Sequence, residues 1–221
     1  MANSQKIPLF PLHTVLFPGM VLPLHIFEDR YKLMIYRCVT ENLPFGVVMI
    51  REGHEARPGA TIFEIGTTAH ITKIDPLGDG RMNIATLGFN RFRIQELGTD
   101  EPYMTAVVED FPLGNLQSEA VRPEARRIGP LLLNYLDIIA SVADIEVDLE
   151  KLPDDATTLA FLAAIVLRVP MEDKQELLSI PTLPEMLWRV RKLLGRETSI
   201  LRHIVNGAPG WIQNSQPFTP N

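Results

Sequence analysis

The residues best suited to chemistry in this sequence form incomplete catalytic motifs. His54 and Glu55 begin like the His-Glu-x-x-His pattern of a zinc-binding helix, but Pro58 stands in place of the second histidine. Both the second ligand and the helix that would align it are therefore missing. No lysine follows a glycine, as a phosphate-binding loop requires, and no serine sits between glycines as in a nucleophile elbow. The sequence predicts a protein that is not an enzyme and has no cofactor or metal.

Two groups of charged residues can be interpreted as binding sites or as ordinary surface. Asp79 and Arg81 flank Gly80 and form either an anion-binding turn or the solvated tip of a hairpin, which is the usual role of an Asp-Gly pair. Three basic residues recur along a C-terminal helix, and a solvated helix face explains them better than nucleic-acid contact. These are Arg189, Lys192 and Arg196.

The segment from residue 25 to residue 31 is the main candidate for binding, because it places aromatic and charged side chains at the start of a predicted helix. A further arginine on a later strand alternates with apolar neighbours and so lies on the polar side of that strand. We expect five side chains to border one groove, and the alternative is that they fix the helix onto the strands. They are His25, Phe27, Arg30, Tyr31 and Arg91.

The N-terminal half, which must position these residues, is predicted to be rich in strands. Prolines interrupt its first apolar runs, which indicates short edge strands and tight corners. One helix is expected at residues 28–41, with Cys38 and Val39 on its apolar face and with Asn42 and Pro44 ending it. Many short strands at close spacing indicate a closed or nearly closed β-barrel, because closure removes exposed edges. After the proline-interrupted runs, strands are expected at residues 45–50, 61–65, 67–74, 82–87, 89–97 and 103–110, with breaks at Gly66 and Gly88.

The C-terminal half is predicted to be helical, because the alternation typical of strands disappears after residues 112–123. The expected organisation is a β-barrel subdomain at 1–116, a helical bundle subdomain at 117–207 and a tail at 208–221. Trp211 and Phe218 are the candidates for holding that tail against the body. Helices are expected at residues 124–143, 154–170, 172–178 and 182–207, and Asp154-Asp155 is expected to cap the second of them.

Composition limits the class of protein. The chain has 221 residues, of which 46% are hydrophobic and 22% charged, an ordinary globular composition. The formal net charge of −6 makes binding to phosphate backbones unfavourable. The single cysteine, Cys38, has the helical spacing of a core residue and excludes a disulfide framework. With no signal peptide and no apolar run of about 18 residues, a cytoplasmic protein without a membrane span is expected.

A series of segments, in this order and spacing, resembles a known family. They include Ile7-Pro8-Leu9-Phe10-Pro11-Leu12, Ile65-Gly66-Thr67-Thr68-Ala69-His70-Ile71, Thr86-Leu87-Gly88-Phe89-Asn90-Arg91-Phe92-Arg93-Ile94 and Tyr103-Met104-Thr105-Ala106-Val107-Val108-Glu109. Over most of residues 7–205 the sequence is similar to the N-terminal substrate-binding domain of the Lon ATP-dependent proteases. The resemblance implies an α+β fold, in which a PUA-like β-barrel with one inserted helix is followed by a C-terminal helical bundle.

The resemblance also implies a function. The ATPase and protease modules of a complete Lon protease would follow this domain, and the sequence ends before them, so the resemblance implies a stand-alone, non-catalytic module. Its partners would be polypeptide segments, and an adaptor in protein quality control is one such role. The alternative is an RNA-binding module, because PUA-like barrels often contact RNA, although the net charge opposes it. A small-molecule hydrolase that uses the scattered His, Asp and Glu residues ranks last.

Overall fold

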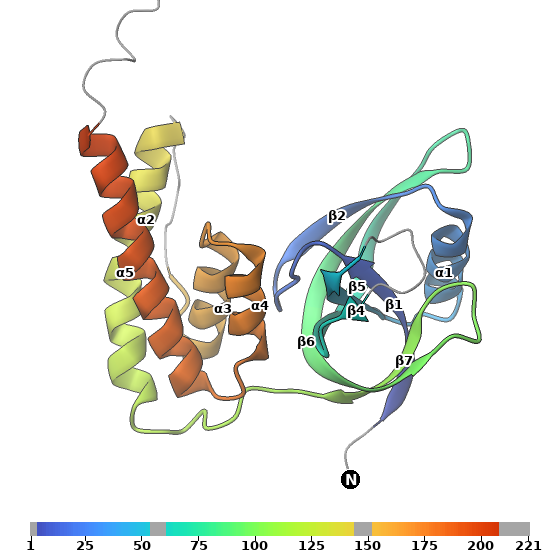
Figure 1. Cartoon of the computed structure of the whole chain (residues 1–221), viewed down its shortest axis with the longest axis horizontal. Coiled ribbons are helices and arrows are strands. Elements are labelled where there is room, and N and C mark those ends of the chain that lie inside the picture. The colour runs from blue at the N-terminus through green and yellow to red at the C-terminus, as the bar shows by residue number, and fades with distance from the viewer. Residues whose placement is uncertain (1–3, 54–60, 144–151, 208–221) are drawn as a thin grey trace, which may run out of the picture.

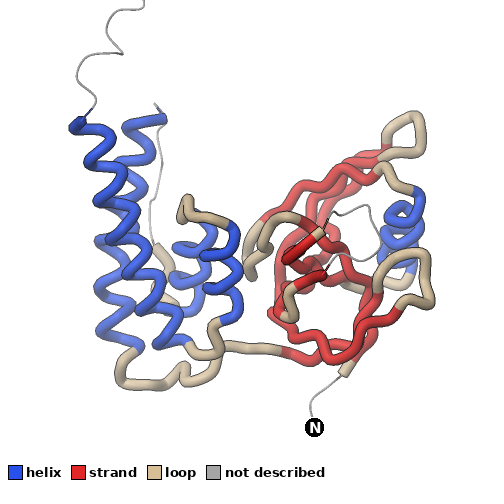
Figure 2. The backbone as a smooth tube through the Cα atoms, viewed as in Figure 1, coloured by secondary structure: helices blue, strands red, loops and turns tan. Residues whose placement is uncertain are grey.

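The computed structural model describes residues 4–53, 61–143 and 152–207. Its strands all lie in the N-terminal part of the chain, and four of its helices follow them in the C-terminal part (Figure 1). The two parts stand side by side: one holds the strands and the first helix, and the other holds the remaining four helices (Figure 2). Residues 54–58, which carry the incomplete zinc-binding pattern, lie outside these ranges. So do Trp211 and Phe218 of the predicted tail.

Over the described residues, the strands form one seven-stranded mixed sheet. Their pairings lead from β1 to β7, β6, β5 and β3 and then back to β1, so that five strands form a closed ring. We call it the strand ring. Among the paired strands that the structure describes, only β1 and β3 run parallel, while β2 pairs with β6 and β4 with β3. The strands are β1 (Gln5–Leu12), β2 (Val21–Ile26), β3 (Phe45–Glu52), β4 (Thr61–Ile62), β5 (Ile65–Pro76), β6 (Met82–Gly98) and β7 (Thr105–Asp110).

The first strand is not an edge strand, contrary to the expectation from its prolines. Residues 5–8 of β1 pair with β7, whereas residues 9–12 pair with β3 on the other side. Each half of β1 therefore pairs with a neighbouring strand on one side only. Pro8 and Pro11 are tolerated there because they lack an N–H donor and no second neighbour requires one.

Two glycines that were expected to end strands lie inside them. Gly88 is part of the continuous β6 strand, and Gly66 is the second residue of β5. At Gly88 a β-carbon would collide with the main-chain oxygen of Phe17. Main-chain hydrogen bonds from Gly19 to Gly88 and from Gly88 to Met20 hold that loop on the strand. These glycines permit close approach of another segment rather than a break.

The predicted helix is present as α1 (Asp29–Thr40) and covers one side of the strand ring, far from the bundle (Figure 1). Asn42, whose φ is 52°, and the following Pro44 end it as expected. Cys38 is buried among apolar neighbours, which confirms its predicted core role. Val39, predicted on the same face, is instead exposed.

The helical part comprises α2 (Val121–Ala143), α3 (Ala156–Val166), α4 (Met171–Ser179) and α5 (Leu183–Gly207). The long helices α2 and α5 pack side by side, and α3 and α4 lie between them and the strand ring (Figure 1). Pro130 lies inside α2 without splitting it. Asp155 caps α3 as predicted, since its carboxylate accepts a 2.7 Å hydrogen bond from the Thr158 amide. No helix in these ranges is long and apolar enough to cross a membrane.

The basic side of α5 is paired rather than merely solvated. Arg189 contacts Asp173 at 3.4 Å and Glu176 at 2.6 Å, both on α4. Arg196 also contacts Asp173, at 2.7 Å, and Lys192 lies over the Trp188 ring. These arginines therefore join two helices, because α4 brings its carboxylates against α5.

Candidate functional site

The candidate site is built on β6, whose side chains point alternately into and out of the strand ring. Phe92 points into the strand ring and joins its apolar interior. Arg91 consequently points outward, as the sequence predicted for a polar side, but there it is only 3% exposed. The side chain is buried because the helical part covers this side of the strand. Nη1 of Arg91 donates hydrogen bonds to the carbonyl oxygens of Leu178 at 2.6 Å and Ile180 at 2.7 Å.

Other contacts complete this joint between the strand ring and the helices. The Gln175 amide on α4 donates a 3.0 Å hydrogen bond to the carbonyl oxygen of Ile65 on β5. The rings of Phe17 and Phe161 lie 6.5 Å apart across the same boundary. Gly114, in the segment that connects the two parts, exchanges main-chain hydrogen bonds with Pro181 and Leu183. The relative position of the two parts is therefore fixed by buried contacts.

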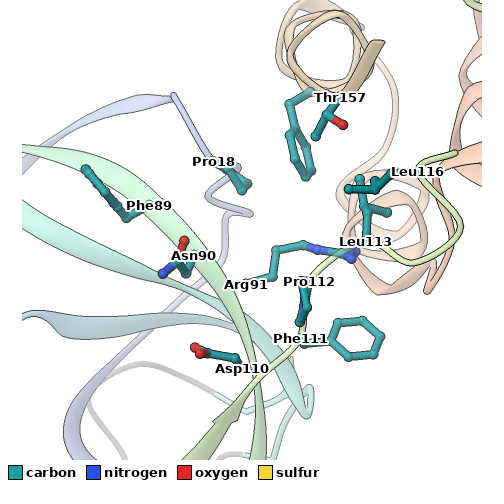
Figure 3. A pocket seen from close by; sticks show the side chains of 11 residues that line it. Pro18, Phe89, Asn90, Arg91, Asp110, Phe111, Pro112, Leu113, Leu116 and Thr157 are labelled. Atoms are coloured by element: carbon teal, nitrogen blue, oxygen red, sulfur yellow. The ribbon is translucent and has the colours of Figure 1, made fainter. Parts of the chain in front are cut away.

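A cleft of about 310 Å³ opens beside this joint (Figure 3). We call it the junction cleft. The strand ring contributes one wall, the connecting segment after β7 the floor, and the start of α3 the other wall. Apolar side chains predominate, as is typical of sites that bind organic ligands. The lining residues are Pro18, Phe89, Asn90, Arg91, Asp110, Phe111, Pro112, Leu113, Leu116, Thr157 and Phe161.

Arg91 carries a positive charge into this apolar environment. Its guanidinium carbon lies 4.8 Å from the centre of the Phe111 ring and 5.9 Å from that of Phe161. Burial lowers the pKa of Arg91 to about 10, because removal from water disfavours the charged form. The Nη2 atom is buried and has no hydrogen-bond partner among the residues that the structure describes. Arg91 thus brings an unused donor and a poorly solvated charge to the cleft.

Asp110 is the acidic side chain in the lining, and it does not pair with Arg91. In Figure 3 its carboxylate points away from the guanidinium group, which extends toward Leu113. Arg93 lies over the same Phe111 ring at 4.5 Å but approaches Glu109 at 3.8 Å. The two arginines of β6 therefore have different electrostatic surroundings.

Four of the five predicted site residues lie around the end of β2 and the start of α1. The His25 and Phe27 rings are 5.9 Å apart, and Phe27 is 58% exposed. The Arg30 guanidinium pairs with Glu28 at 2.9 Å and lies over the Tyr31 ring. Tyr31 itself is buried and stacks on a core phenylalanine. We call the exposed part, His25 and Phe27, the β2–α1 surface.

Arg91, the fifth predicted residue, does not join this group, because it lies at the joint with the helices. Sequence reasoning did not select the apolar residues around it. Phe161 has the spacing of an ordinary helix core residue, and Leu113 and Leu116 lie in a connecting segment. The apolar run Phe111-Pro112-Leu113 directly after the last strand is the one sequence signal for this wall. Within the described ranges no cluster of three or more His, Cys, Asp or Glu side chains could hold a metal ion.

The fold and the cleft define an α+β module with a ligand-sized groove between its strands and its helices. The sequence matches the family model of the ATP-dependent protease La (LON) substrate-binding domain over residues 6–196. The chain belongs to this family, which confirms the resemblance found in the sequence.

Curated relatives are much longer proteins. Lon protease 2 of Myxococcus xanthus is 32% identical over 202 residues, which cover 90% of this chain and 24% of the relative. The Lon protease of Flavobacterium johnsoniae is 31% identical, with 81% of this chain and 22% of the relative covered. The chain thus spans about a quarter of the length of these relatives.

Solved structures share the fold. The Lon N-terminal domain protein from Xanthomonas campestris superposes with a TM-score of 0.64 at 25% identity, over 86% of this chain and 98% of that one. The N-terminal domain of the Mycobacterium avium complex Lon protease gives a TM-score of 0.66 at 19% identity, with the same shares covered. The arrangement of mixed sheet and helices is therefore the fold of Lon N-terminal domains.

Proposed function

We propose that the chain is a non-catalytic module that binds extended polypeptide segments, with the junction cleft as the binding site. The observation that carries the proposal is an open, mainly apolar cleft between strands and helices in a chain of the Lon substrate-binding domain family. In the cell it would act in the cytoplasm, as an adaptor that delivers clients to the machinery of protein quality control.

The chemistry of the cleft suits a polypeptide better than a nucleic acid. Phe89 and Leu116 are large apolar side chains at its walls that are 54% and 47% exposed. Such surfaces gain free energy by covering apolar side chains of a partner. The formal net charge of −6 opposes binding of phosphate backbones. We therefore favour a polypeptide partner over RNA.

Two finer assignments belong to the same proposal. The strand ring would be the PUA-like β-barrel, with a boundary between subdomains at residues 116 and 117. The β2–α1 surface would be a second contact region for the same polypeptide. Its exposed Phe27 ring supports this assignment, because exposed aromatic side chains are frequent anchors in interfaces.

Binding can be tested with fluorescein-labelled, unstructured ten-residue peptides and fluorescence anisotropy. Leu116→Asp places a charge in the apolar wall and should weaken binding at least tenfold. Tyr36→Asp, on the outer side of α1, is the matched control and should leave binding unchanged, because Tyr36 is also an exposed apolar residue but lies outside the cleft.

Two results would refute the assignment. Retention of all peptides at the level of an inert acidic protein of similar size would refute polypeptide binding. Equal weakening by the two substitutions would refute the junction cleft as the site.

A further inference from the structure

We propose that the junction cleft selects polypeptides that present a carboxylate group next to an apolar side chain, and that Nη2 of Arg91 is the donor that binds the carboxylate. This inference rests on the proposed function and specifies its ligand. The carboxylate can come from the free C-terminus of a chain or from an Asp or Glu side chain, and the experiment below separates these sources.

The guanidinium group of Arg91 has one occupied and one unoccupied donor nitrogen. Nη1 is occupied by two carbonyl oxygens, at 2.6 Å and 2.7 Å. Nη2 is buried without any partner in the part of the chain that the structure describes. Buried charged donors are costly to leave unpaired, and a guanidinium group matches the planar geometry of a carboxylate. A carboxylate oxygen would therefore complete the hydrogen bonds of this side chain.

No carboxylate side chain in the described lining of the cleft neutralises the charge of this guanidinium group. Both contacts of Nη1 are neutral carbonyl groups, so they do not cancel its charge. The Asp110 carboxylate points away from it (Figure 3). The nearby rings of Phe111 and Phe161 exclude water and so strengthen the attraction of an anion to this charge. The same apolar walls would accommodate the side chain beside the carboxylate.

Access to Nη2 requires a side chain to move. Nη2 is buried in the structure, so a carboxylate must displace part of the wall. Leu116 lines the cleft and is 47% exposed. A change of its rotamer opens the wall at little cost, because few contacts hold an exposed leucine in place. We therefore expect the ligand to enter where Leu116 lines the cleft and to reach Arg91 beside Leu113, toward which the guanidinium group extends (Figure 3).

The test uses the full chain and three labelled ten-residue peptides. The first ends in leucine with a free carboxylate, the second is the same peptide with an amidated end, and the third is amidated but carries a glutamate beside its last leucine. The free acid should bind about tenfold more tightly than the amide, since a charge-assisted hydrogen bond contributes on that order. If the glutamate peptide regains the lost affinity, the site accepts side-chain carboxylates; if it does not, the site reads the C-terminus.

Variants then assign the effect to Arg91. Arg91→Lys keeps the charge but lacks Nη2, and it should bring the free acid and the amide to within about twofold of each other. Arg93→Lys is the matched control, because Arg93 lies on the same strand over the same Phe111 ring but outside the cleft. It should preserve the full difference.

Arg91 also holds the two parts together, so its variant can lose stability, and a second substitution avoids this difficulty. Asp110→Asn removes the acidic group from the lining while leaving Arg91 intact. It should tighten binding of the free acid severalfold relative to the amide, because only the acid carries a terminal charge that Asp110 repels.

The outcomes separate the two proposals. Equal affinity of the free acid, the amide and the glutamate peptide would overturn carboxylate selection while polypeptide binding stands. Absence of binding by all three peptides would overturn both. If Asp110→Asn and Arg91→Lys both leave the preference for the free acid unchanged, the carboxylate binds elsewhere. That result would overturn the role of Arg91.

Discussion

Arg91 and Arg93 show how one strand gives two similar side chains different roles. Both extend from the outer side of β6 and lie over the ring of Phe111. Arg93 reaches the surface and faces Glu109, whereas Arg91 is covered by helices and binds carbonyl groups from the end of α4 and the segment that follows it. The difference arises from what packs on the strand and not from the strand itself.

Gly88 leaves no room for a side chain on β6. Gly88→Ala should lower the free energy of unfolding by about 2 kcal/mol, because the new β-carbon meets the main-chain oxygen of Phe17, which cannot turn aside as a side chain can. Gly78→Ala is the control, since nothing lies within 4 Å of its added β-carbon and a change within about 0.5 kcal/mol is expected. Urea denaturation measures both, and equal midpoints for the two variants would contradict the prediction.

At the scale of elements, α3 links the stability of the bundle to the shape of the cleft. Its first turns carry Thr157 and Phe161, which form one wall. Asp155 fixes the start of the helix by accepting hydrogen bonds from the Thr158 amide at 2.7 Å and its hydroxyl at 2.8 Å. The position of the wall therefore depends on a cap that lies outside the cleft.

Removal of this cap should affect stability and binding together. Asp155→Ala is expected to cost about 1 kcal/mol of stability and to weaken peptide binding, because the first turn of α3 frays. Asp155→Asn keeps a side-chain acceptor and should remain close to the native protein in both respects. Urea denaturation and peptide anisotropy provide the two readouts. Loss of stability without any change in affinity would show that the first turn does not shape the site.

At the scale of the whole molecule, the two parts are joined by buried polar contacts as well as by apolar packing. Arg91 and Gln175 each bind main-chain carbonyl groups across the joint. Breaking these contacts would leave charged and polar groups buried without partners, which is costly. The strand ring and the bundle are therefore expected to unfold together.

Cooperative unfolding of the two parts can be measured in the intact chain. Hydrogen exchange under increasing urea should give one common opening free energy for β6 and α5. Arg91→Met should separate the two values, because the joint loses its charged donor while the apolar cores of both parts remain. Distinct opening free energies in the native protein would instead support two independent subdomains.

Several features followed from the sequence by itself. The strand-rich first half, the helices after residue 120, the cap at Asp155 and the buried Cys38 follow from local rules of periodicity, capping and apolar spacing. The ordered segments also identified the family, which the comparison confirms. These features depend on residues close together in the chain, so the sequence carries their signal directly.

Tertiary structure decided the rest. Whether β1 is an edge strand depends on which strands lie beside it, and whether Gly88 ends a strand depends on a loop that approaches from residues 17–20. Arg91 has the pattern of a residue on the polar side of a strand, and only the packing of the helical part, through carbonyl groups 87 and 89 residues further along the chain, made it buried. The junction cleft itself is formed by segments far apart in the chain, because burial and cavities arise from long-range packing that no local pattern records.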